Sequence, residues 1–143
     1  MNEDIIISEN DIVQSEIDRV NELMLQLNPA SSELDFAVVQ KVMESGFIFI
    51  ARDRSGLIIG MASLIPARKL FAYFGSVEDV IVDEKSRGLG LGKLLTKTII
   101  EKARELRMKY LDLTSSPERE LANKLYQSVG FEKRNTNVYR RRV

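Results

Sequence analysis

The sequence contains no cysteine and no histidine, and these two absences exclude several kinds of chemistry. Without cysteine there is neither a disulfide framework nor a thiol nucleophile. Without histidine, a Ser-His-Asp triad is impossible within one chain, and so are the usual zinc sites. Any general base must therefore be a carboxylate, a tyrosine, a lysine or the N-terminus.

The chain also lacks an excess of charge of either sign and any long apolar run. Lys+Arg and Asp+Glu each number 21, so no global field favours nucleic acid or an acidic membrane. The first four residues include two acidic side chains and no basic one, whereas a secretory signal begins with basic residues, and no apolar stretch approaches transmembrane length. We expect a cytoplasmic protein with no nucleic-acid or membrane partner, and 143 residues suit one domain.

The most informative stretch runs from residue 77 to residue 95. Residues 77–82 are β-branched apart from an acidic pair, which is typical of a strand. A short polar turn and a glycine-rich loop follow. The apolar positions after the loop have the spacing of an amphipathic helix, and they are Leu91, Leu94, Leu95, Ile99, Ala103 and Leu106.

The loop between this strand and this helix has glycine at alternate positions, Gly88, Gly90 and Gly92. Without a Cβ, these residues let backbone N–H groups approach a ligand closely. Unpaired N–H groups and the helix dipole make a helix N-terminus a favourable place for a phosphate. Arg87 and Lys93 add positive charge, so the loop predicts a phosphate-bearing ligand, with a solvated turn as the alternative.

The spacing of the glycines excludes two familiar phosphate motifs. A P-loop needs Ser or Thr after Gly-Lys, but Leu94 follows Gly92-Lys93, and Arg87 stands where the first glycine belongs. The dinucleotide fingerprint would need its third glycine at Lys93 or Leu95. The pattern that remains is Arg-x-x-Gly-x-Gly over residues 87–92.

The rest of the chain reads as strands and helices without an internal repeat or linker. A loop is expected at residues 66–69, and Gly60 suggests a bulge. Three consecutive strands before a β-α-β unit predict a mixed sheet flanked by helices. The expected strands are 5–8, 47–52, 57–65, 71–82, 110–114 and, more weakly, 131–133 and 138–140; the expected helices are 12–27, 31–45, 91–108 and 116–130.

The Arg-x-x-Gly-x-Gly pattern resembles the acetyl-CoA-binding motif of the GNAT superfamily of N-acetyltransferases. A second segment, Ala122-x-x-Leu125-Tyr126-x-x-x-Gly130-Phe131, is similar to another motif of that family. The resemblance covers residues 47–131 well and the first 45 only in helix count. It implies an α/β (α+β) GNAT-like fold, a mixed, mostly antiparallel central sheet flanked by helices, as a single domain over residues 1–143.

The resemblance further implies an enzyme that moves an acetyl group from acetyl-CoA, as cosubstrate, to a primary amine, without a metal. The acceptor would be a small molecule or a peptide or protein amine. Direct attack in a ternary complex is expected, since no cysteine is available for an acyl-enzyme. A homodimer is a further expectation. The alternative is a catalytically inactive acyl-CoA-binding sensor or interaction module of the same fold.

The family's cofactor contacts transfer onto two parts of this sequence. In the family, the free backbone edge of the strand before the loop pairs with the amide-rich pantetheine arm. The diphosphate is bound mostly by N–H groups of the loop. The residues implied are Val80, Ile81 and Val82 for pantetheine, and Arg87, Gly88, Leu89, Gly90, Leu91, Gly92 and Lys93 for the diphosphate.

Two residues are implied in catalysis. Tyr126 matches the family tyrosine that protonates the departing sulfur, with an ordinary amphipathic-helix tyrosine as the alternative. Glu78 is the candidate base: in a regular strand it shares a face with Val80 and Val82, and apolar neighbours favour a raised pKa. A substrate-ammonium anchor, an ion pair or proton transfer through water remain alternatives. Asp79 should face the opposite way.

One position departs from the family pattern. Many members have an asparagine that binds pantetheine three residues before the helix alanine, and here that residue is Arg119, while Asn123 follows the alanine. The contact therefore does not transfer directly. Arg119 could instead reach a phosphate or be solvated near the helix start.

Overall fold

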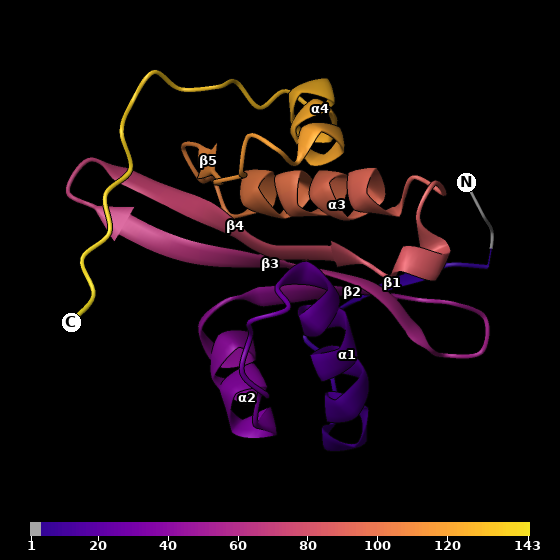
Figure 1. The fold of residues 1–143 in the computed structure, drawn as a ribbon. Helices are drawn as coiled ribbons and strands as arrows, with labels where there is room; N and C mark the ends of the chain where they lie inside the picture. The colour runs from indigo at the N-terminus through magenta and orange to yellow at the C-terminus, as the bar shows by residue number, and fades with distance from the viewer. Residues whose placement is uncertain (1–3) are drawn as a thin grey trace.

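The computed structural model describes residues 4–143 and contains one five-stranded sheet with the spatial order β1-β2-β3-β4-β5 (Figure 1). The first four strands pair antiparallel, and only the β4–β5 pair is parallel. The mixed, mostly antiparallel sheet predicted from the sequence is therefore confirmed. The strands are β1 (Ile6–Glu9), β2 (Phe47–Arg52), β3 (Ile58–Lys69), β4 (Ala72–Val82) and β5 (Leu111–Asp112).

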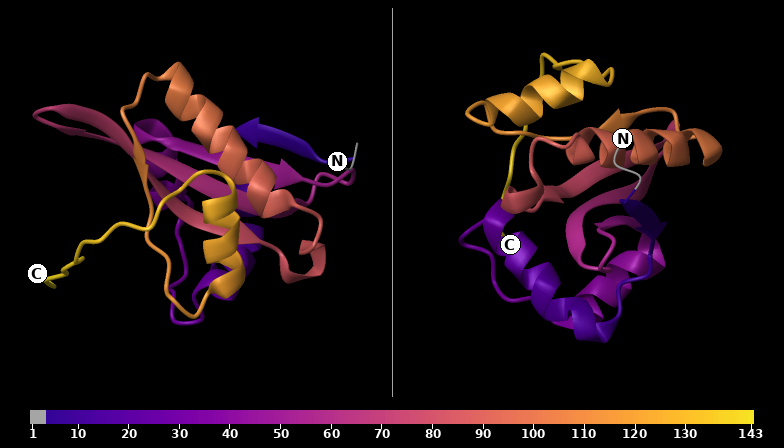
Figure 2. Two further views of the ribbon diagram at one scale, coloured as in Figure 1. Left: turned by 90° about the horizontal axis from the view of Figure 1, so that it is seen from above. Right: turned by 90° about the vertical axis from the view of Figure 1, so that its right-hand side faces the viewer.

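Helices cover both faces of this sheet (Figures 1 and 2). The helices α1 (Ile17–Leu27) and α2 (Phe36–Ser45) lie on one face. On the other face, α3 (Leu91–Glu105) packs along the sheet and α4 (Glu120–Ser128) lies beside it. Short 3-10 turns precede α1 and follow β4. No helix in residues 4–143 is long and apolar enough to cross a membrane.

Two hydrophobic clusters, one on each face, hold the layers together. Alternating side chains of β2 and β3 divide between them, as expected for a sheet buried on both faces. The cluster under α1 and α2 comprises Ile12, Val20, Leu23, Val39, Ile48, Ile50, Ile58, Met61 and Ile81. The cluster under α3 comprises Phe49, Ala51, Ile59, Ala62, Leu64, Val77, Leu91, Leu95 and Ile99.

The β3–β4 hairpin is longer than predicted from the sequence, and the prediction of a loop at residues 66–69 is wrong. These residues continue β3 and pair with β4. Pro66 lies beyond Leu64, the last residue of β3 that pairs with β2, so its missing N–H interrupts no ladder on that side. The guanidinium of Arg68 lies 4.7 Å from the centre of the Tyr73 ring, a cation–π contact between the two strands.

The bulge predicted at Gly60 is confirmed to within one residue. Ala51 pairs with Gly60 and Arg52 with Ile58, which leaves Ile59 without a partner in β2. A Cβ on Gly60 would lie 3.2 Å from the carbonyl oxygen of Ile81, so glycine permits the close contact between β3 and β4.

The ends of the helices differ from the predicted ones by a few residues. The second helix begins at Phe36 rather than near residue 31, because Asp35 caps it by accepting from the N–H of Ala37. The α1 helix begins at residue 17 after a 3-10 turn, and α3 ends at residue 105. The last helix begins at Glu120, because the N–H of Arg119 closes a turn onto the carbonyl of residue 116.

The prediction of two strands after α4, at residues 131–133 and 138–140, is wrong. In residues 4–143 no strand follows α4, and residues 132–143 are exposed throughout. The segment points away from the body of the molecule (Figure 2). Charged residues dominate it, and its apolar side chains are not buried: Tyr139 is 86% exposed. The expected strand at residues 110–114 shortens to β5, two residues long.

Candidate functional site

The site begins where β4 and β5 part. The two strands pair only at Gly75–Leu111 and Ser76–Asp112. At this junction a Cβ on Gly75 would lie within 2.7 Å of the Leu111 side chain, so only glycine fits. Beyond Ser76, the β5 side of β4 has no strand partner within residues 4–143. The backbone of residues 80–82, predicted to bind pantetheine, lies on this stretch.

The glycine loop lies directly after β4 and opens into α3. Gly88 and Gly90 have φ values of 83° and 77°, the left-handed region that favours glycine. A Cβ at either position would meet no atom within 4 Å, so the space beside the loop is open. The Nε of Arg87 donates to the carbonyl of Val82 at 3.3 Å, which ties the loop to the end of β4.

The remaining loop residues divide into backbone and side-chain candidates. Leu91 is 2% exposed and its side chain belongs to the core, so only its N–H can face a ligand. Gly92 lies inside α3, where a Cβ would come within 3.0 Å of Leu125 on α4. Leu89 and Lys93 are exposed. Since the first N–H groups of a helix have no intrahelical acceptor, the start of α3 offers donors for an anion.

A cavity of about 280 Å³ lies between the free part of β4 and α4. It brings together both predicted catalytic residues, Glu78 and Tyr126, and it includes Arg119. Asn123 is not among its lining residues; its side-chain amide donates to the carbonyl of Ser116 and so has a structural partner. The lining residues are Leu27, Val77, Glu78, Asp79, Val80, Leu113, Thr114, Ser116, Arg119 and Tyr126.

Tyr126 is held rigidly in the wall of this cavity. It is 7% exposed, and its ring packs edge-on against Phe131 with 6.0 Å between ring centres. Its carbonyl accepts from the N–H of Phe131 at 3.0 Å, after a turn at Gly130 with φ of 100°. Burial raises the pKa of the Tyr126 hydroxyl, and the positive charge of Arg119 opposes that shift. The hydroxyl therefore stays protonated at neutral pH.

The two acidic residues of β4 lie at a bulge that the sequence did not predict. Glu78 pairs with Ser63 and Ile81 with Met61, so Ala62 alone faces Asp79 and Val80.

This bulge overturns the regular alternation assumed for the strand. Val77, Val80 and Val82 all pack into the α3-side cluster, so Glu78 does not share the face of Val80 and Val82. Asp79 is not separated from the site either, because it lines the cavity together with Glu78.

A buried ion pair that was not predicted from the sequence lies beside the loop. Asp83 is 8% exposed and accepts from Nη2 of Arg19 at 2.5 Å and from Gln26 at 3.2 Å, both on α1. Burial alone would raise the pKa of the Asp83 carboxyl, but these bonds outweigh it and hold the pKa below its usual value. Arg19 and Asp83 are 64 residues apart, and no local pattern marks their contact.

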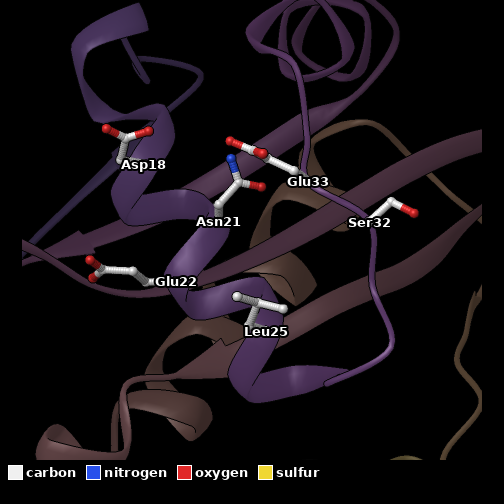
Figure 3. Close-up of a pocket in the computed structure, with 6 residues that line it drawn as sticks. All are labelled: Asp18, Asn21, Glu22, Leu25, Ser32 and Glu33. Carbon is white, nitrogen blue, oxygen red and sulfur yellow. The ribbon is translucent and has the colours of Figure 1, made fainter.

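A second cavity, of about 360 Å³, lies between α1 and the segment that leads to α2 (Figure 3). Asp18, Glu22 and Glu33 line it, together with Asn21, Leu25 and Ser32. None of the predicted catalytic or cofactor-binding residues lines it. In the part of the chain that the structure describes, no group of three or more acidic residues is arranged to hold a metal ion.

This chain matches a known protein family and a named relative. The Acetyltransferase (GNAT) family matches residues 17–131. A Drosophila melanogaster protein named as a probable glucosamine 6-phosphate N-acetyltransferase is 36% identical over 89 residues. That match covers 59% of this chain and 39% of the relative, so the chain spans well under half of the relative's length.

Solved structures show the same fold. An acetyltransferase from Trypanosoma brucei superposes with a TM-score of 0.79 at 24% identity, covering 96% of this chain and 99% of the other. Glucosamine-6-phosphate N-acetyltransferase from Arabidopsis thaliana has the same TM-score at 20% identity, covering 97% and 99%. The GNAT-like fold expected from the two motifs is thereby confirmed, and the chain belongs to the acetyltransferase (GNAT) family.

Proposed function

We propose that this chain transfers an acetyl group from acetyl-CoA to a primary amine by direct attack in a ternary complex. The observation that carries the proposal is the unpaired edge of β4 beyond Ser76, which runs between the glycine loop and the cavity that contains Tyr126. An extended, amide-rich ligand arm pairs naturally with such an edge. Its ends would then reach an anion site on one side and the cavity on the other.

The chain's residues fit acetyl-CoA at both ends. The open space beside Gly88 and Gly90 admits a diphosphate to the N–H groups at the start of α3, and Arg87 and Lys93 supply positive charge. The backbone of Val80–Val82 would bind the pantetheine arm. Acetyl-CoA supplies the activated acetyl thioester. Every remaining requirement of the reaction falls to residues of the cavity.

Three chemical tasks remain for the cavity. The ammonium of the acceptor must lose a proton before it can attack, and a carboxylate of β4 is suited to take it. The departing sulfur benefits from a proton, which the hydroxyl of Tyr126 would donate from the wall of the cavity. An N–H group on the free edge of β4 would stabilise the negative charge that develops on the carbonyl oxygen.

Glucosamine 6-phosphate is the acceptor to test first. The support is the 36% identity to the Drosophila melanogaster relative over 89 residues. The cavity also combines the negative charges of Glu78 and Asp79 with the positive charge of Arg119. The carboxylates suit the amine of such an acceptor, and the arginine suits a phosphate.

Calorimetric titration with acetyl-CoA is the first experiment, with ATP and NADH as competing candidates for the loop. A Gly90→Val variant should lose acetyl-CoA affinity at least tenfold, because a side chain would fill the cradle and strain a residue with φ of 77°. Gly56→Val is the matched control. Gly56 also has a left-handed φ, 88°, and open space around it, but it lies in the β2–β3 turn.

The control separates loss of the ligand site from loss of folding. We expect both variants to be destabilised by about 1–2 kcal/mol and only Gly90→Val to lose acetyl-CoA affinity. Wild-type protein that does not bind acetyl-CoA would contradict the proposal. Binding without CoA release on any amine, glucosamine 6-phosphate included, would favour the inactive sensor.

A further inference from the structure

We propose that Asp79, rather than Glu78, takes the proton from the acceptor's ammonium group. The inference rests on the proposed N-acetyltransferase function and assigns a step that the fold alone leaves open between two neighbouring carboxylates. Both residues line the 280 Å³ cavity, but the bulge in β4 gives them different surroundings.

The backbone at Asp79 is in an uncommon conformation. Its φ of 52° lies in the left-handed region, which few residues other than glycine adopt, although Asp and Asn adopt it more readily than most. Such strain persists where the surrounding structure enforces it, and it clusters at functional sites. Here the conformation accompanies the two-against-one pairing opposite Ala62, and a second acidic residue joins Glu78 in lining the cavity that Tyr126 also lines.

Glu78 already has a hydrogen-bond partner. The hydroxyl of Ser76 donates to Oε1 of Glu78 at 2.7 Å, and Glu78, like Asp79, is exposed. Within residues 4–143, no donor forms a hydrogen bond with the carboxylate of Asp79. The oxygens of Asp79 are therefore available to an ammonium group in the cavity. In Glu78, by contrast, Oε1 already accepts a hydrogen bond from Ser76.

The surroundings of Asp79 favour proton uptake by its carboxylate. Desolvation by the surrounding protein raises the pKa of the Asp79 carboxyl even though the residue keeps solvent contact, and the negative charge of Glu78 raises it further. Arg119, which directly precedes α4, and Tyr126 on α4 line the same cavity, and the lining residues from α1 and from residues 113–116 are uncharged. A base is more effective as its pKa rises toward the working pH.

The step balances without any further reactant. Asp79 takes one proton from the ammonium group, and the freed lone pair forms the C–N bond as the C–S bond breaks. Tyr126 gives its hydroxyl proton to the departing sulfur. The proton lost from the new amide nitrogen restores Tyr126, and Asp79 releases its proton to solvent. Glu78 acts as a positioning residue whose charge strengthens Asp79 as a base.

The decisive experiment compares Asp79→Asn with Glu78→Gln. Asparagine also tolerates the left-handed conformation, so Asp79→Asn removes the charge without forcing the bulge to rearrange. With acetyl-CoA and glucosamine 6-phosphate, we expect kcat to fall about 100-fold or more in Asp79→Asn and less than tenfold in Glu78→Gln. The acidic limb of the kcat/KM profile should disappear in Asp79→Asn. In Glu78→Gln it should move to lower pH, because the charge that raises the pKa of Asp79 is gone.

A second readout does not depend on turnover. In the protein without acetyl-CoA, the side-chain carboxyl carbon of Asp79 is followed by NMR against pH and assigned by its absence in Asp79→Asn. Its midpoint should lie above the ordinary aspartate value of about 4 and fall in Glu78→Gln. A midpoint at or below about 4, or equal loss of kcat in both variants, would overturn the assignment. Wild-type protein that fails to bind acetyl-CoA would instead overturn the proposed function.

Discussion

The buried pair of Arg19 and Asp83 provides the sharpest test of how α1 is fixed to the sheet. Their side chains are 17% and 8% exposed, and the two charged atoms are 2.5 Å apart. Replacing Asp83 by asparagine would leave the Arg19 charge largely buried without its main counter-charge. Removing one partner of a buried pair costs about 3–5 kcal/mol. Arg19 would retain bonds to Glu22 and to the carbonyl of Ile58, which argues for about 3 kcal/mol.

The dependence on pH follows from the direction of the Asp83 shift. Its pKa in the folded protein lies below the usual value, so the folded state prefers the ionised carboxylate. The stabilisation is fully present above the unfolded-state pKa of about 3.9 and is lost as pH falls through the lower folded-state pKa. The difference in unfolding free energy between wild type and Asp83→Asn should thus be constant from pH 7 to about pH 5 and shrink below pH 4.

Urea unfolding at pH 7 measures the effect, and 3 kcal/mol corresponds to a fall in Tm of about 6–12 °C for a protein of this size. Glu22→Gln is the control, because it removes a partner of Arg19 whose side chain is 65% exposed, and it should cost under about 1 kcal/mol. Adding Arg19→Met to Asp83→Asn should recover part of the loss. A loss in Asp83→Asn no larger than that of Glu22→Gln would refute the reasoning.

Three other predictions concern catalysis and packing. Tyr126→Phe should lower kcat about 100-fold while leaving acetyl-CoA affinity intact by calorimetry, since only the proton donor is removed; unchanged turnover would exclude it from the mechanism. Gly75→Ala should cost about 1–3 kcal/mol in urea unfolding, because the new Cβ would meet the side chain of Leu64 within 2.4 Å; a smaller loss would mean that the junction of β4 and β5 can relax. Leu95→Ala should cost about 2–5 kcal/mol, because this α3 side chain is fully buried in the cluster between α3 and the sheet; a loss below 1 kcal/mol would contradict its place in the core.

The features that were predicted well from the sequence are those that depend on residues close together in the chain. The apolar stripe from Leu91 and the glycines before it marked both the helix and the loop where the structure has them. The end of the last helix was predicted at Gly130, two residues beyond the observed end, because the turn there is marked by a glycine within one short stretch.

The features that were missed depend on contacts between distant segments. Pro66 suggested a loop, but it is tolerated because β2 ends before it, a fact about a neighbouring strand. The bulge at Asp79 depends on the register of β4 against Ala62. The contact between Arg19 and Asp83 depends on how α1 crosses the sheet. The strands predicted after α4 had suitable residues, but strand formation also requires a partner.

The exposed segment after Phe131 has a practical consequence for biochemistry with this protein. Five of its last eleven residues are lysine or arginine, so trypsin should trim it rapidly while the packed domain resists. Because Phe131 is the last residue that packs against the α3-side cluster, the trimmed product should retain the core. The same exposure makes the segment a suitable attachment point for a fluorophore or a surface tether, because residues 132–143 belong to neither hydrophobic cluster.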